Sequence, residues 1–172
     1  MGQYYNIIFL ADTKGTKEII RLWIDTSVYG GVKLMEHAYI GESVMNIVEF
    51  MLCPKGMFYK GRLVWAGDNA EKEPECSENL YEMAQNKNDF RMSTIPPLPY
   101  RYIVNHTKQQ YVDKNKVKEI HPLALLVAEG GAGGGGDYYG KNDHLCGTWS
   151  RDVISMENEI PNTFLELECE FE

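Results

Sequence analysis

The sequence lacks a long apolar run, and it lacks the features of a secretory leader. A helix that spans a membrane needs roughly 20 mostly apolar residues, and no such run is present. The amino terminus, MGQYYNIIFLADTKG, has neither the basic start nor the small-residue cleavage site of a signal peptide. These absences predict a cytoplasmic protein with no membrane partner.

Closely spaced cysteines and clusters of basic residues are also missing. The four cysteines, Cys53, Cys76, Cys146 and Cys169, stand far apart, whereas a zinc site needs paired ligands. We therefore expect free thiols and no metal. The net charge is −8, and phosphate backbones attract clustered Lys and Arg, so we expect no direct contact with nucleic acid.

What the chain does have is the length and apolar content of one domain, residues 1–172, with 44% hydrophobic residues. Runs rich in β-branched and aromatic residues predict strands at 4–10, 18–25, 61–67, 121–129 and 164–172, a hairpin within 101–114, and one strand or pair within 145–157. Helical spacing predicts helices over 42–52 and from about Ser77. The fold class is therefore α+β, a single domain with a mostly antiparallel sheet of about seven short strands and two short helices.

The carboxyl-terminal segment has the clearest alternation in the chain. Its apolar positions are Leu165, Leu167, Cys169 and Phe171, and its acidic positions are Glu166, Glu168, Glu170 and Glu172. Strict alternation predicts a half-buried strand, with Leu165, Leu167 and Phe171 directed inward. The acidic side is either a solvated strand face or a surface for a basic partner, with Glu166, Glu168 and Glu170 as the contact residues.

A run of glycines is the main candidate for a binding site. Six of the seven positions from Gly130 to Gly136 are glycine, and without a Cβ their backbone N–H groups can turn inward as an anion-binding nest. An aspartate and tyrosines follow, which could read a ribose or stack on a base. The candidate ligand-binding residues are Gly133, Gly134, Gly135, Gly136, Asp137 and Tyr138. The alternative is a flexible connection in which Asp137 binds local amides.

Two phosphate-binding motifs match this run only in part. Gly131-x-Gly133-x-x-Gly136 has the glycine spacing of a dinucleotide fingerprint, but Gly140 and Gly147 interrupt the helix that should follow. Gly135-x-x-x-x-Gly140-Lys141 resembles a P-loop until Asn142, where a Ser or Thr is needed for magnesium. We reject both, and no motif predicts a cofactor.

Catalytic residues do not stand out. The four histidines are scattered, and Glu36 with His37, His106 with Asp113, and Asp137 with His144 can each be drawn as an acid–base pair. No spacing requires any of these pairs to form, and no residue is singled out as a nucleophile. The sequence therefore favours a binding protein over an enzyme and predicts no catalytic residue.

Several short motifs together resemble a family of small bacterial and phage proteins that open with Met-Gly-Gln-Tyr-Tyr. The shared pieces are MGQYYN, KLMEH, VWAGD, NLY, VNHT with YVD, HPLALL, GGGDY and GTWSRDVIS, in this order over nearly the whole chain. The chain departs from the pattern at Ala124, where a proline is usual, and at Asn69, where a tyrosine is usual. Its glycine run also reads Gly-Gly-Ala-Gly instead of Gly-Asn-Gly-Arg. The resemblance implies a context of bacteria, prophages and phages, and no particular reaction.

This context favours an accessory protein that antagonises host machinery, in one of two ways. In the first, the glycine run binds and sequesters a small nucleotide-like ligand. In the second, the acidic surface blocks the basic nucleic-acid-binding groove of a host effector protein, as an anti-CRISPR protein would. A nucleotide-processing enzyme is a third hypothesis, and homo-oligomerisation stays open.

Overall fold

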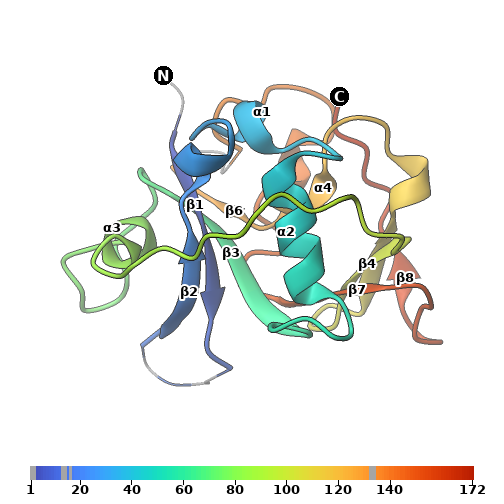
Figure 1. The fold of residues 1–172 in the computed structure, drawn as a ribbon, viewed down its shortest axis with the longest axis horizontal. Helices are drawn as coiled ribbons and strands as arrows, with labels where there is room; N and C mark the ends of the chain where they lie inside the picture. Colours follow the sequence, from blue (N-terminus) through green and yellow to red (C-terminus); the bar gives the residue numbers. More distant parts are fainter. Residues whose placement is uncertain (1–2, 13–14, 16, 132–134) are drawn as a thin grey trace.

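The computed structural model describes residues 3–12, 15, 17–131 and 135–172, and it shows the single α+β domain that the sequence predicts (Figure 1). Among these residues one sheet runs in the order β2-β1-β3-β7-β4-β5-β8, and β6 pairs with β3. The pairings β3–β6 and β5–β8 are parallel and the others are antiparallel. The strands are β1 (Tyr5–Leu10), β2 (Ile20–Ile24), β3 (Gly61–Gly67), β4 (Tyr102–Asn105), β5 (Gln110–Asp113), β6 (Ala128–Glu129), β7 (Val153–Glu157) and β8 (Leu165–Glu166).

The described helices are short. They are α1 (Leu34–His37), α2 (Ser43–Leu52), α3 (Leu80–Ala84) and α4 (Pro122–Leu126), with 3₁₀ turns η1 (Thr26–Tyr29), η2 (Lys114–Lys116) and η3 (Asp143–Leu145). The helix expected over 42–52 is confirmed as α2, and the one expected from about Ser77 is confirmed as α3. No described helix has the length and apolarity needed to cross a membrane.

Strand β1 is buried along its whole length because both faces of the sheet are covered there. Ile7 and Phe9 belong to the main core, which includes the apolar side of α2, whereas Ile8 and Leu10 belong to a smaller core with α3. Alternate residues of a strand point to opposite faces, so one apolar run supplies both cores. In Figure 1, α2 and α3 accordingly lie on either side of β1 and β3.

The strand predicted over residues 121–129 is wrong for most of its length. Residues Pro122–Leu126 form α4, and only Ala128–Glu129 pair with β3. The Nδ1 atom of His121 accepts a hydrogen bond from the backbone N–H of Leu123 at 3.3 Å, and Pro122 occupies the first turn, where it needs no N–H partner. A short buried helix and a buried strand are equally apolar, so the sequence pattern does not separate them.

The tail strand is shorter than predicted. Strand β8 contains only Leu165–Glu166, and the Leu165 side chain is 73% exposed instead of directed inward. Cys169 and Phe171 are buried, but they lie in an irregular segment beyond the strand. The alternating pattern therefore identifies two buried positions correctly and overestimates the length of the strand.

Candidate functional site

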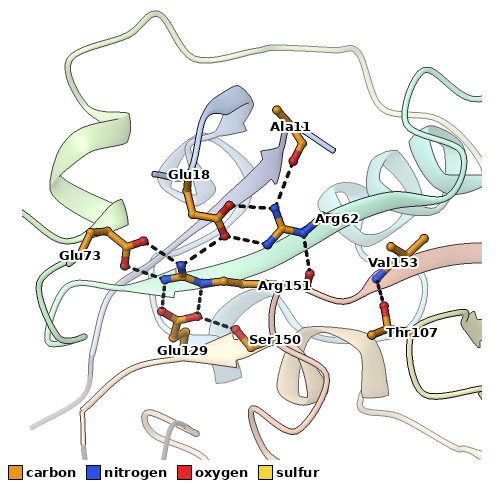
Figure 2. Close-up of polar contacts among 9 residues, drawn as sticks. All are labelled: Ala11, Glu18, Arg62, Glu73, Thr107, Glu129, Ser150, Arg151 and Val153. Carbon is orange, nitrogen blue, oxygen red and sulfur yellow. Dashed lines mark hydrogen bonds and ion pairs between the residues drawn. The ribbon is translucent and has the colours of Figure 1, made fainter. Parts of the chain in front are cut away.

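A cavity of about 610 Å³ lies beside β3, where the connection between β1 and β2 meets residues 73–76 and 150–153. We call it the ion-pair cavity, because two arginines and two glutamates line it: Glu18, Arg62, Glu73 and Arg151. Its volume falls within the range of small-molecule sites in proteins, about 300–1,000 Å³. Figure 2 shows how the charged groups converge from different strands and loops.

Arg151 is the centre of this network, because all five of its N–H groups donate to carboxylates. Glu129, on β6, accepts from Nε at 2.9 Å and also from Nη2. Glu73 binds the two terminal nitrogens in a bidentate fashion, at 2.7 Å each. Glu18 accepts from Nη1 at 3.3 Å. Charge-assisted bidentate pairs of this kind fix the plane of a guanidinium group.

Arg62, near the start of β3, extends the network to the connection between β1 and β2. It forms a bidentate pair with Glu18 at 2.8 and 2.7 Å, and it donates to the backbone carbonyls of Ala11 and Arg151 at 3.1 Å each. Because Glu18 touches both arginines, the two guanidinium groups are held beside one another (Figure 2). The network therefore joins β3, β6 and the β1–β2 connection.

The backbone around the cavity adopts a conformation that side chains usually avoid. Arg151 has a φ of 65°, and Glu75, between the lining residues Pro74 and Cys76, has a φ of 61°. Non-glycine residues in this left-handed region are uncommon and tend to cluster at functional sites. The backbone N–H of Arg151 donates to the carbonyl of Leu63 on β3 at 2.9 Å, which holds the turn in place.

Hydrogen bonding within the network favours the charged forms of Glu18 and Arg151. Hydrogen bonding from Arg62 outweighs burial and lowers the pKa of Glu18. Burial alone would lower the pKa of Arg151, but the hydrogen bonds that it donates to Glu73 and Glu129, together with their negative charges, outweigh burial and raise this pKa. Three carboxylates surround two guanidinium groups, so the network has an excess of one negative charge.

Sequence reasoning did not identify this cavity, although the motif GTWSRDVIS contains four residues that line it, Ser150 to Val153. Its charged lining residues are scattered from position 12 to position 152, and each is typical of a surface charge in its own segment. Only the topology, which places β6 and the turn after Trp149 next to β3, brings them together. No local spacing carries that information.

The glycine run occupies a different region, and its flanks are packed against β1. Gly133 and Gly134 lie outside the described residues, so their predicted role stays a prediction. Gly136 has a φ of 60°, and a Cβ there would lie 2.7 Å from the ring of Tyr5. The N–H of Gly131 donates to the side-chain oxygen of Gln3 at 2.8 Å.

The two side chains predicted to bind a ligand beside this run are engaged by the protein itself. Oδ1 of Asp137 accepts a hydrogen bond from the N–H of Met35 at 3.1 Å, at the start of α1. The Tyr138 hydroxyl donates to the carbonyl of Lys141 and accepts from the N–H of Glu172 at 3.1 Å. Tyr139, the second tyrosine that could stack on a base, is 84% exposed and borders hollows of about 570 and 430 Å³.

The predicted acidic contact residues are partly paired with lysines. Both carboxylate oxygens of Glu166 accept from Lys116, at 2.8 and 2.7 Å. Glu170 lies 3.7 Å from both Lys118 and Lys141, whereas Glu168 is exposed. The tail therefore presents less free negative charge than its sequence suggests.

A histidine, a serine and a glutamate also lie together, on the hairpin and β7. Nε2 of His106 is 2.7 Å from the hydroxyl of Ser155, which donates to Glu157 at 2.6 Å. A hydrolytic triad needs the histidine between the nucleophile and the acid, and here the serine is in the middle. Ser155 is also fully buried, so this cluster does not form such a triad.

No family model, curated protein or solved structure matches this chain. Within the described part of the chain, no group of three or more His, Cys, Asp or Glu side chains could hold a metal ion.

Proposed function

We propose that this protein binds and sequesters a small molecule in the ion-pair cavity. The observation that carries the proposal is the convergence of Glu18, Glu73 and Arg62 on a left-handed Arg151 at the wall of a cavity of about 610 Å³. A network of charge-assisted pairs that holds polar groups in a fixed arrangement beside a cavity suits recognition.

Binding, as opposed to chemical conversion, is supported by how the polar groups are used. The arginines and glutamates bind one another, and among the described lining residues no serine, threonine or cysteine side chain contacts a histidine that could act as its base. Sequestration of a ligand from host machinery would also fit the phage context that the motif resemblance implies.

This proposal moves the ligand site away from the glycine run. Asp137 and Tyr138 are committed to hydrogen bonds within the protein, and Gly136 is required by its contact with Tyr5. The pairing of Glu166 with Lys116 likewise gives less support to an acidic surface that docks on a basic effector.

Two cysteines allow the proposal to be tested at each candidate site. Cys76 lines the ion-pair cavity, and Cys146 lines the hollow beside Gly135 and Gly136; both are partly exposed. We expect the dialysable small-molecule fraction of a bacterial extract to slow alkylation of Cys76 and to leave that of Cys146 unchanged, measured by peptide mass spectrometry. Because burial raises the pKa of Cys146 to about 11, labelling should be done in mildly alkaline buffer.

Native mass spectrometry of protein purified from bacteria gives the complementary measurement, since a bound molecule adds its mass to the folded chain. If the extract protected Cys146 and not Cys76 from alkylation, the ligand would bind beside the glycine run. Equal labelling of both cysteines with and without extract, together with an unmodified native mass, would contradict ligand binding.

A further inference from the structure

If the ion-pair cavity binds a small ligand, as proposed above, the hydrogen-bonding groups on its wall decide the chemistry of that ligand. The five N–H groups of Arg151 all bind carboxylates. Arg62 uses all but one of its N–H groups on Glu18 and on two backbone carbonyls within the described residues. An anion entering the cavity would therefore find almost no free donors on either arginine.

The carboxylate oxygens on the cavity wall, in contrast, still have unused hydrogen-bond acceptor sites. An ionised carboxylate offers about four lone-pair sites. Glu73 uses two of them, one on each oxygen, and Glu18 uses three. Both residues line the cavity, and so do Asp12 and Asp152. Oδ2 of Asp152 already accepts from Asn105 and Lys108, which leaves its Oδ1. The wall is therefore equipped to accept hydrogen bonds from a ligand.

The charge balance of the cavity points in the same direction. Its lining holds four carboxylates and three cationic side chains, the third being Lys17. Of their partners outside the lining, Glu129 adds a negative charge and Lys108, 2.6 Å from Asp152, adds a positive one, so an excess of one negative charge remains. The whole chain carries a net charge of −8, which adds a field that attracts cations and repels anions. Met83, Pro74 and Val153 complete the wall with apolar surface.

We infer that the ion-pair cavity takes an organic amine, a ligand with an ammonium or guanidinium head and an alkyl stem. The head donates to the unused lone pairs of Glu73 and Glu18, and the stem packs on Met83 and Val153. A phosphate-bearing ligand is disfavoured because its charge would meet carboxylates in place of free guanidinium N–H groups.

Isothermal titration with agmatine and spermidine, set against adenosine monophosphate and inorganic phosphate, tests this inference. We expect the amines to bind, the two anions not to bind, and amine affinity to fall as salt is raised. Glu73→Gln keeps the shape of the side chain and removes its charge, so it should weaken amine binding about tenfold or more. The matched control is Glu71→Gln, which makes the same charge change at an exposed residue of the same loop and should leave affinity unchanged.

A second variant covers the case in which Glu73→Gln fails to fold. Asp12 is exposed and lines the cavity, so Asp12→Asn should preserve the fold and weaken amine binding several-fold. Circular dichroism establishes that each variant is folded. Amine affinity that does not respond to either substitution would overturn the inference.

Alkylation of Cys76 separates a wrong ligand class from a wrong site. Protection of Cys76 by bacterial extract, or by adenosine monophosphate, without protection by either amine would refute the amine and keep the cavity as the binding site. Absence of protection by extract, amines and anions alike would refute both the amine and the proposed function.

Discussion

The ring of Tyr5 fills the space that a side chain at Gly136 would need. A Cβ at Gly136 would lie 2.7 Å from the ring, and the residue has a φ of 60°. Gly130 is similarly enclosed, because a Cβ there would clash with the side-chain oxygen of Gln3. At its described flanks, the glycine run is therefore shaped by its contact with β1, independently of any ligand.

Gly136→Ala should accordingly destabilise the protein by more than backbone strain alone. The left-handed conformation costs an L-residue about 1–2 kcal/mol, and displacement of the Tyr5 ring adds to that cost. Gly41→Ala is the control, since Gly41 also has a positive φ, 92°, but no atom of the described residues lies within 4 Å of an added Cβ. Urea denaturation should show a larger loss for Gly136→Ala, and equal losses would mean that the Tyr5 contact is easily relieved.

His37 should make the protein sensitive to mild acid. The side chain is fully buried, its Nε2 accepts a hydrogen bond from Nε1 of Trp65 at 2.9 Å, and its Nδ1 lies 3.0 Å from the carbonyl of Gly31. Burial lowers the pKa of His37, and the opposing effects of the Gly31 carbonyl and of the Asp137 and Glu36 charges are smaller. The imidazole is therefore neutral, with its proton on Nδ1.

The sign of the pH effect follows from this lowered pKa. As pH falls through about 6.5, the unfolded chain takes up a proton on His37 before the folded protein does, so stability decreases. The slope contributed by this residue reaches at most about 1.4 kcal/mol per pH unit. Urea denaturation between pH 7 and pH 5 should show a flatter profile for His37→Gln, whereas His144→Gln, at an exposed position, should retain the parental slope.

The tail should be stabilised by Phe171 and not by Leu165. Phe171 is 3% exposed and meets the ring of Tyr138 edge-on, with centroids 5.3 Å apart. Phe171→Ala should therefore lower the free energy of unfolding by about 3 kcal/mol. Leu165→Ala, at an exposed edge position, should change it by less than about 0.5 kcal/mol. Thermal melts of the two variants distinguish a docked tail from a loose one.

The secondary structure was predictable in segments whose apolar periodicity and whose length indicate the same element. Residues 61–67 and the helix over 42–52 carry patterns that their own segments determine, and both form as expected. Between His121 and Glu129 every residue is apolar, so periodicity does not distinguish a helix from a strand there. The helical start of this run depends on the cap at His121 and on tertiary packing. Leu165 is exposed because only two residues of the tail pair with β5.

The candidate site was not predictable by the same reasoning. A glycine run is visible in a sequence because its residues are adjacent, whereas Arg62, Glu73 and Arg151 become neighbours only through the order of the sheet. Long-range ion pairs have no local signature in one sequence. The left-handed φ of Arg151 is equally hidden, because the residue type at that position gives no sign of it.

Arg151 offers the most direct test of the network. Replacing it leaves Glu73 and Glu129 without their guanidinium partner, and breaking a largely buried pair in this way costs about 3 kcal/mol. Arg151→Ala should therefore be clearly destabilising in urea denaturation. Arg91→Ala, which removes an exposed arginine paired with Asp89, should leave the denaturation curve unchanged.

The backbone at Arg151 adds an unusual second expectation. Both Arg151→Ala and Arg151→Gly remove the ion pairs, but only glycine adopts a φ near 65° without strain. Arg151→Gly should therefore be more stable than Arg151→Ala by about 1 kcal/mol, although glycine ordinarily destabilises a chain relative to alanine. If alanine were instead the more stable of the two, Arg151 would not be held in a strained conformation, and the network would lose its clearest sign of a functional role.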